Sequence, residues 1–352
     1  MSLTQYLTLG RSGLRVSPLC LGTMTFGTEW GWGSDEATCG PILDAYLQAG
    51  GNFLDTADLY TGGKSEEICG RLIRDRNLRD RIVLATKYTF NAERGNPNAG
   101  GNGRKNMYRA LEGSLRRLQT DYIDLYWMHV WDGVTPVEEV MTSMNDLVRA
   151  GKVRYFGFSD VPAWYAARAQ TLAQFAHSEP AIALQLEYSL VERNIEREHI
   201  PAAREFGMGI CPWSPLAGGF LAGKYKRGEP GEGRLETLSA SGNITFERRN
   251  ERNWRILDVL LDASKAIGRL PAEVALNWVA TQRGVSSTIV GATKMSQLES
   301  NLRALEFTIP PEIRARLDQA GALDRAHPYV MFDSPPFPEM INGGVPVRGW
   351  TS

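Results

Sequence analysis

The stretch "YIDLYWMHVWDGVTPVEEVMTSMNDLVRAGKVRYFGFS", residues 122–159, decides the fold class of this chain. Both of its ends are largely apolar at consecutive positions, which is typical of parallel strands covered on both faces. Between them, Thr135 is the predicted N-cap of a helix, and Glu138 completes a capping box. Pro136 suits the first helical turn, and Gly151 suits the end of the helix. The stretch therefore predicts a strand–helix–strand unit.

The same alternation continues along the rest of the chain. The other strand candidates are residues 16–23, 52–55, 82–87, 182–188, 208–213 and 287–291. Eight strands alternating with amphipathic helices favour an α/β fold, a (β/α)8 TIM barrel. An open doubly wound sheet would carry a Gly-x-Gly-x-x-Gly turn after its first strand, where this chain has "GTMTFG".

The predicted barrel is a single domain over residues 1–352 with three additions. An N-terminal β-hairpin turns around Ser12. Long loops over 91–105 and 220–250 follow strands, so they belong to the C-terminal face, where barrel enzymes build their sites. An irregular tail, rich in proline and aromatic residues, begins at about residue 324.

Composition narrows the class of partner. The formal net charge is -1, which gives no electrostatic reason to expect nucleic acid or an anionic membrane. No apolar run reaches the roughly 18 residues of a membrane span, and the start of the chain predicts no signal peptide. The scattered cysteines, without a Cys-x-x-Cys pair, indicate a reducing cytoplasm and no zinc site. The oligomeric state stays open, with a homo-oligomer among the options.

Polar side chains at three neighbouring strand ends are the catalytic candidates. Asp55, Lys87 and His129 end consecutive predicted strands, and Tyr60 follows in the loop after the first of them. A tyrosine is a weak acid at neutral pH, and a nearby lysine ammonium favours its phenolate. A carboxylate would hold that ammonium in place, and the imidazole could orient a carbonyl oxygen. The set suits protonation of an alkoxide formed by hydride addition, although a structural ion pair and a packed loop tyrosine are the plainer interpretations.

Two further groups are weaker candidates. The stretch "GGFLAGKY" (218–225) matches the start of a phosphate-binding loop but lacks the Ser or Thr that would bind magnesium. It is interpreted as a phosphate-cradling backbone with a lysine and no metal, or alternatively as a flexible glycine loop. Five aromatic residues in loops after the strands could form a lip for a planar apolar substrate, or pack loop against loop: Trp30, Trp32, Tyr88, Phe90 and Trp131.

From about residue 5 to 325 the chain resembles the aldo-keto reductase superfamily, in the branch similar to potassium-channel β subunits and bacterial aldo/keto reductases. The segments "NFLDTADLY", "LATK" and "DLYWMH" are similar to those that carry the family's Asp-Tyr-Lys-His tetrad. The resemblance implies NADPH, bound extended across the barrel mouth. The implied cofactor-binding residues are Thr23, Met24, Asp55, Ser159, Asp160, Gln185, Trp213, Ser214, Pro215, Leu216, Ala217, Gly218, Lys224, Arg234, Gly291, Thr293, Lys294, Gln297 and Asn301.

Within this resemblance, Trp213 would stack on the nicotinamide, and Ser159, Asp160 and Gln185 would hold its carboxamide. Asp160 stands where asparagine is more usual in the family. Likewise, Gln297 replaces an arginine of other branches, and Ser300 stands where glutamate is common.

The expected function is NADPH-dependent, reversible reduction of an aldehyde or ketone to an alcohol, with Tyr60 as proton donor and a small carbonyl compound as substrate. One alternative is an NADPH-binding regulatory subunit with slow turnover. Another is a non-redox barrel lyase or isomerase. The histidine position is altered in channel subunits, whereas this chain keeps His129, which favours the reductase.

Overall fold

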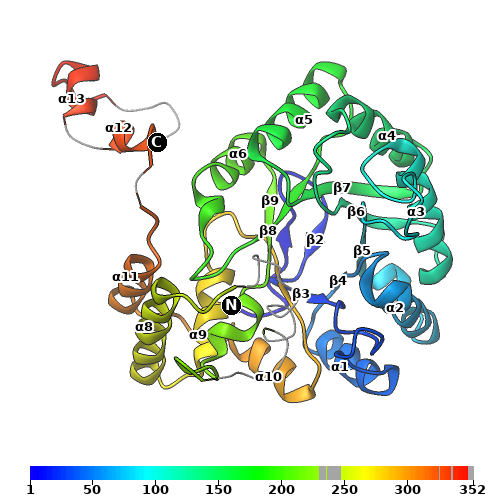
Figure 1. Ribbon diagram of the computed structural model, residues 1–352, viewed down its shortest axis with the longest axis horizontal. Helices are drawn as coiled ribbons and strands as arrows, with labels where there is room; N and C mark the ends of the chain where they lie inside the picture. The colour runs from blue at the N-terminus through cyan, green and yellow to red at the C-terminus, as the bar shows by residue number, and fades with distance from the viewer. Residues whose placement is uncertain (230–234, 236–246, 325, 334–335, 348–352) are drawn as a thin grey trace.

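Eight parallel strands form the centre of the molecule. The computed structural model describes residues 1–229, 235, 247–324, 326–333 and 336–347. The 8-stranded sheet has the order β10-β3-β4-β5-β6-β7-β8-β9 and curls into a barrel surrounded by helices (Figure 1). Its strands are β3 (Leu19–Gly22), β4 (Phe53–Asp55), β5 (Val83–Tyr88), β6 (Ile123–Met128), β7 (Val153–Ser159), β8 (Ala183–Glu187), β9 (Gly209–Trp213) and β10 (Thr288–Val290). A parallel bridge from Ile210 to Val285 closes the ring, which confirms the predicted (β/α)8 barrel.

Helices alternate with these strands along the chain. They are α1 (Glu36–Gln48), α2 (Lys64–Asp75), α3 (Arg104–Leu118), α4 (Val137–Arg149), α5 (Ala163–Ala176), α6 (His199–Phe206), α8 (Glu251–Ile267), α9 (Pro271–Ala280), α10 (Met295–Arg303) and α11 (Pro311–Ala320). Short 3-10 segments are η1 (Tyr60–Gly63), η2 (Arg79–Arg81), η3 (Asn194–Glu196) and η4 (Ala217–Ala222). Among the described residues, no helix has the length and apolar character that crossing a bilayer requires.

The predicted start of α4 was wrong by one position. Pro136, with φ −59° and ψ 138°, is the N-cap, and the helix begins at Val137. The Thr135 hydroxyl donates instead to Oδ2 of Asp132 at 2.6 Å. That carboxylate also accepts from the backbone N–H groups of Val134 and Thr135, so the loop before α4 is held by Asp132 rather than by a capping box.

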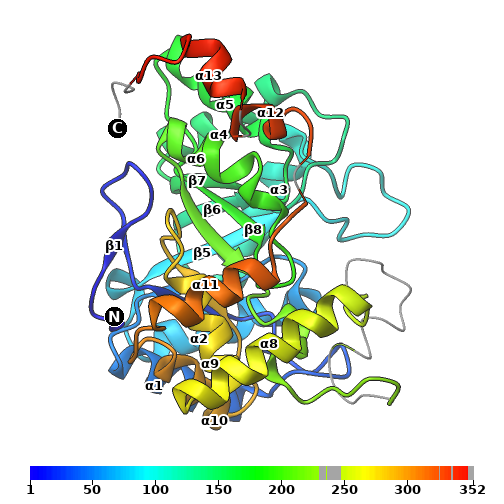
Figure 2. The same ribbon diagram turned by 90° about the vertical axis from the view of Figure 1, so that its left-hand side faces the viewer.

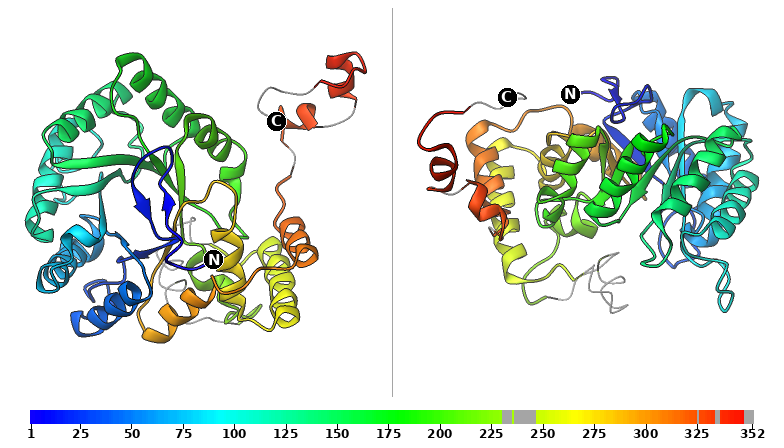
Figure 3. Two further views of the ribbon diagram at one scale, coloured as in Figure 1. Left: turned by 180° about the vertical axis from the view of Figure 1, so that it is seen from behind. Right: turned by 90° about the horizontal axis from the view of Figure 1, so that it is seen from above.

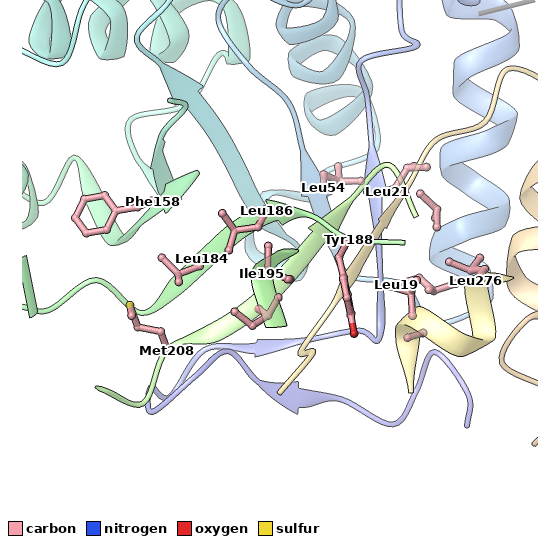
Figure 4. Packing of buried hydrophobic residues seen from close by; sticks show 14 of the residues in the cluster. Leu19, Leu21, Leu54, Phe158, Leu184, Leu186, Tyr188, Ile195, Met208 and Leu276 are labelled. Carbon is pink, nitrogen blue, oxygen red and sulfur yellow. The ribbon is translucent and has the colours of Figure 1, made fainter. Parts of the chain in front are cut away.

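Alternating side chains of the strands face two different cores. One cluster lies between strands and helices and includes Leu54, Leu184 and Leu276 (Figure 4). The other fills the barrel interior and includes Val83, Ala85 and Trp127. Because side chains in a strand alternate between faces, residues at odd positions of β4 and β5, Asp55 and Lys87 among them, also point inward.

All four cysteines are free and buried. Burial raises the pKa of Cys39 and of Cys69 to about 12. It also raises the pKa of Cys20 and Cys211, with the charge of Asp55 adding to the effect. At neutral pH these side chains are therefore thiols packed as small apolar groups.

The N-terminal hairpin covers the bottom of the barrel. Its strands β1 (Leu7–Thr8) and β2 (Arg15–Val16) pair antiparallel, and the hairpin crosses the end opposite the loop over residues 91–105 (Figures 2 and 3). Gly10 has φ +61°, and a Cβ there would lie 2.3 Å from the carbonyl oxygen of Ile182. Glycine therefore lets the turn pack directly against the barrel, where Leu9 is fully buried.

The C-terminal tail stands away from the barrel. The sequence predicted an irregular segment, and the structure instead forms two short helices, α12 (Tyr329–Asp333) and α13 (Phe337–Asn342). They contact each other and lie beyond α11, clear of the barrel (Figures 1 and 3). Met340 and Ile341 are 70% and 76% exposed, so α13 buries little apolar surface.

Candidate active site

Three parallel strands bring the tetrad candidates together. Asp55 ends β4, Lys87 is the last but one residue of β5, and His129 directly follows β6. Lys87 Nζ donates to the Asp55 carboxylate, to the carbonyl oxygen of Thr56 at 2.8 Å and to Tyr60 Oη at 3.1 Å. Tyr60 begins η1, 27 residues before Lys87 in the chain, yet its hydroxyl meets the lysine at the C-terminal face.

The Asp55–Lys87 ion pair is almost completely buried. Lys87 is 0% exposed and Asp55 is 2% exposed. Gln185 Nε2 donates to Oδ1 of Asp55 at 3.0 Å from across the barrel, so both carboxylate oxygens have donors. Burial lowers the pKa of Lys87. The charges of Asp55 and Tyr60 and their hydrogen bonds raise this pKa by more than burial lowers it, so the net shift is upward. Lys87 is therefore an ammonium across the neutral pH range.

The His129 ring has two aromatic neighbours, the rings of Phe90 and Tyr60. Its ring centroid is 4.8 Å from that of Phe90 and 5.8 Å from that of Tyr60. Burial, and then the charge of Lys87, lower its pKa well below the usual range. Nδ1 is buried and has no hydrogen-bond partner within the described part of the chain. The imidazole is thus neutral, with one N–H donor and one lone pair.

Asp160 and Trp213 form a second polar contact next to the tetrad. The indole Nε1 of Trp213 donates to Oδ1 of Asp160 at 3.0 Å. Asp160 follows β7 with φ +45°, a left-handed conformation that aspartate tolerates better than most residues. Burial raises its pKa to about 6, opposed by the Trp213 hydrogen bond and by the charge of Lys87. Ser159 and Gln185 are buried in register beside it on β7 and β8.

The segment after β9 turns sharply. Ser214, Ala217, Gly218 and Gly219 all have positive φ, and the Ser214 hydroxyl accepts from the backbone N–H of Gly218 at 3.1 Å. Pro215 and Leu216 lie within the same turn, and Lys224 is exposed just beyond it. Arg234, predicted to close over this segment, lies outside the described residues.

The segment before α10 is tied to the loop after β3. Thr293 donates through its backbone N–H to Oε1 of Gln297 at 2.7 Å, and Asn301 Nδ2 donates to the carbonyl oxygen of Gly291 at 3.2 Å. Lys294 is the N-cap of α10 and is exposed. Sequence reasoning missed Thr25 and Ser34, whose hydroxyls donate to the carbonyl oxygens of Ala292 and Thr293. No local motif marks these contacts, because each joins positions more than 250 residues apart.

Thr23, which directly follows β3, contacts residues of β4 and α2. The Thr23 side chain is fully buried, and its hydroxyl contacts Ser65 Oγ at 2.8 Å and the carbonyl oxygen of Asp55 at 3.1 Å. Thr23 therefore ties β3 to β4 and α2. Met24, the next residue, is half-buried.

Three of the five predicted lip residues gather at the tetrad. The Trp30 ring lies 5.5 Å from Trp32 and 6.4 Å from Tyr60, measured between centroids. Phe90 lies against His129 and is 40% exposed. These three residues are called the aromatic rim below.

The other two predicted lip residues lie elsewhere. The prediction for Tyr88 was wrong. Tyr88 is fully buried in the core between strands and helices, and its ring stacks on that of Tyr126 with 5.1 Å between the ring centroids. It follows the inward-pointing Lys87, so the alternation of the strand turns it outward toward the helices. Trp131 packs on Trp164 of α5 at 5.5 Å and lines an open groove of about 370 Å³ that also borders Asp160, Glu187, Glu192 and His199.

A buried lysine–carboxylate pair beside a tyrosine and a neutral histidine, at the mouth of a parallel barrel, defines an oxidoreductase-type barrel site. The model of the Aldo/keto reductase family matches residues 18–322, and the chain belongs to that family.

Its relatives include named enzymes. The chain is 35% identical over 336 residues to "Aryl-alcohol dehydrogenase [NADP(+)]" of Phanerodontia chrysosporium, covering 91% of this chain and 86% of that protein. It is 38% identical over 326 residues to "Uncharacterized oxidoreductase YrpG" of Bacillus subtilis, covering 89% and 95%. It is 35% identical over 333 residues to "Norsolorinic acid reductase" of Aspergillus flavus, covering 92% and 83%.

Proposed function

We propose that this protein catalyses the reversible, NADPH-dependent reduction of an aldehyde or ketone to an alcohol. The observation that carries the proposal is the Lys87 ammonium, held by Asp55 and donating to Tyr60 Oη at 3.1 Å beside a neutral imidazole. Family membership supports carbonyl chemistry, and two relatives are named as an NADP(+) alcohol dehydrogenase and a reductase.

The donor set fits a dinucleotide phosphate. The left-handed turn at Ser214–Gly218 and the exposed cation of Lys224 suit the pyrophosphate. Lys294 at the N-terminus of α10, with Thr293 and Gln297 beside it, suits the 2′-phosphate, since cations and helix N-termini both favour anions. Ser159, Asp160 and Gln185 would meet the carboxamide, and Trp213 the nicotinamide ring.

When bound, NADPH supplies the hydride that the carbonyl carbon accepts. Tyr60 gives its hydroxyl proton to the carbonyl oxygen, and the Lys87 ammonium stabilises the phenolate left behind. Asp55 holds Lys87 in position. His129 donates a hydrogen bond to the same oxygen without competing as an acid, because its ring is neutral. In the alcohol-to-carbonyl direction the same groups act in reverse.

The aromatic rim points to a planar aryl substrate. Trp30, Trp32 and Phe90 offer ring faces and edges around Tyr60 and His129, which suits aromatic carbonyl compounds. One relative is named an aryl-alcohol dehydrogenase, which agrees with this choice.

Tyr60→Phe tests the proposal. The variant keeps the ring and loses the proton donor, so turnover of an aryl aldehyde should fall about 10²–10⁴-fold while the Kd of NADPH stays within about twofold. Single-turnover and binding measurements separate the two effects. A variant that keeps more than half of the wild-type kcat would contradict the role of Tyr60. A wild-type protein that binds NADPH but reduces no member of an aldehyde and ketone panel would support the regulatory alternative.

A further inference from the structure

A carboxylate without a balancing cation lies at the proposed nicotinamide subsite. Asp55 and Lys87 neutralise each other, and His129 is neutral. Glu187, at the end of β8, forms a salt bridge with Arg248. Asp160 has the indole N–H of Trp213 as its hydrogen-bond donor, and no salt bridge to it occurs among the described residues. When Asp160 and Glu187 are both ionised, the charges of these groups sum to one negative charge, which resides on Asp160.

The two redox forms of the cofactor differ in charge at this place. The nicotinamide ring is cationic in NADP⁺ and neutral in NADPH, whereas the phosphates are common to both. A half-buried carboxylate therefore attracts the oxidised ring selectively, and in a partly desolvated site this attraction is larger than in water. An asparagine at the same position would accept the same hydrogen bonds without distinguishing the two forms.

We propose that Asp160 makes this enzyme bind NADP⁺ more tightly, relative to NADPH, than a neutral residue at that position would. The inference rests on the proposed function, because it requires the nicotinamide to lie beside Trp213. The preference for NADP⁺ would affect the two directions of the reaction differently. The protein loads readily with NADP⁺ for alcohol oxidation, and the release of NADP⁺ becomes slow after carbonyl reduction.

A merely structural role for Asp160 has a different signature. If the carboxylate served only to orient the Trp213 ring, Asp160→Asn would preserve that function, because the amide oxygen still accepts from Nε1. Asp160→Ala would remove both the charge and the acceptor, and so would also release the Trp213 ring. A change of selectivity in Asp160→Asn, which keeps the acceptor, therefore comes from the charge.

The experiment measures the Kd of NADP⁺ and of NADPH by calorimetric titration for the wild type, Asp160→Asn and Asp160→Ala. Asp160→Asn should weaken NADP⁺ about tenfold, which is about 1.4 kcal/mol, and NADPH by less than about threefold. Equal effects on both forms, or an unchanged ratio, would overturn the proposal while leaving the proposed function intact. Failure of the wild type to bind either form would overturn the proposed function itself.

Glu192→Gln is the matched control. Glu192 borders the same groove as Asp160 and the change removes the same charge, but its carboxylate binds Asn194 at the outer edge. The ratio of the two Kd values should equal that of the wild type. A change as large as that of Asp160→Asn would assign the effect to the general field of the groove and overturn the role of Asp160.

The wild type provides a second measurement that needs no variant. Because the pKa of Asp160 is raised to about 6, the ratio of the NADP⁺ to the NADPH Kd should fall about tenfold from pH 5 to pH 8. Titration of the cofactor phosphates cancels in this ratio. Two charged groups interact with Asp160. The charge of Lys87 on β5 lowers the pKa of Asp160, and the charge of Asp160 raises the pKa of Glu187 on β8, which pairs with Arg248. Glu187, with a pKa raised to about 7, titrates in the same pH range. The pH dependence of the Kd ratio that remains in Asp160→Asn measures the contribution of Glu187. A flat wild-type ratio would overturn the proposal.

Discussion

Lys87 and Asp55 form a buried ion pair, so each is expected to depend on the other for stability. Each is buried, and removing one partner leaves an uncompensated charge that costs about 3–5 kcal/mol. Lys87→Met should therefore lower the free energy of unfolding strongly, because among the described residues the Asp55 carboxylate then keeps the Gln185 amide as its donor and no cation. Adding Asp55→Asn should recover most of that loss. Urea unfolding of both single variants and the double variant measures the coupling, and a double variant as unstable as Lys87→Met would contradict it.

Asp160 has a stability cost that its replacement should reveal. Its pKa is raised to about 6 in the folded protein, against roughly 4 in an unfolded chain. The folded state thus binds the proton more tightly, and stability is lost as the pH rises from the unfolded pKa through the folded one. Asp160→Asn removes this loss. Its stability relative to the wild type should increase by about 1 kcal/mol between pH 5 and pH 8, measured by urea unfolding, and a constant difference would refute the burial of the charge.

Strand β7 is constrained by a close approach inside the barrel. Gly157 pairs in register with Trp127 of β6, and a Cβ on Gly157 would lie 2.4 Å from the Trp127 ring and 2.7 Å from the carbonyl oxygen of Ala183. Gly157→Ala should cost about 1–3 kcal/mol or more, because the ring is fully buried and has no room to move. It should also reduce kcat, since Trp127 pairs in register with Lys87.

Gly13→Ala is the control for that change. Gly13 lies in the hairpin turn, and the nearest atom to an added Cβ is 3.9 Å away. The two variants lose the same backbone freedom in the unfolded chain. Equal midpoints of urea unfolding for both would show that the barrel interior tolerates the extra methyl group at residue 157.

The elements show why part of the site could be predicted from sequence. Strand ends in a parallel barrel converge on one face, so Asp55, Lys87 and His129 could be grouped without coordinates. The same alternation that directs Lys87 inward directs Tyr88 outward, and applying it residue by residue would have removed Tyr88 from the substrate lip. The hydrogen bonds from Thr25 and Ser34 to the segment before α10 could not be predicted, since they depend on loop conformations that no short motif encodes.

At the scale of the whole molecule, the described part of the tail lies outside the barrel. The family match ends at residue 322, and α12 and α13 stand clear of the barrel with exposed apolar side chains. A chain ending at Asp324 should keep the wild-type Tm within about 3 °C and an unchanged kcat. Differential scanning calorimetry and aldehyde turnover check both.

Leu317→Ala, in α11 just before the tail, provides the contrast. Leu317 is fully buried, so this single change should cost about 2–5 kcal/mol. A truncated chain that loses as much stability as this variant would show that the tail contributes to the barrel after all.

The buried thiols bear on how such a protein tolerates its own substrates. Aldehydes and quinone-like carbonyls are electrophiles, and thiolates are the protein nucleophiles that they modify most readily. Here all four sulfur atoms are buried, so a carbonyl compound cannot reach them. Burial also raises the thiol pKa values, so the reactive thiolate does not form at neutral pH. In the folded protein the cysteines are therefore protected from reactive carbonyl compounds. Modification of these thiols has to wait for unfolding, so the lifetime of the fold sets the rate at which they are lost in such a medium.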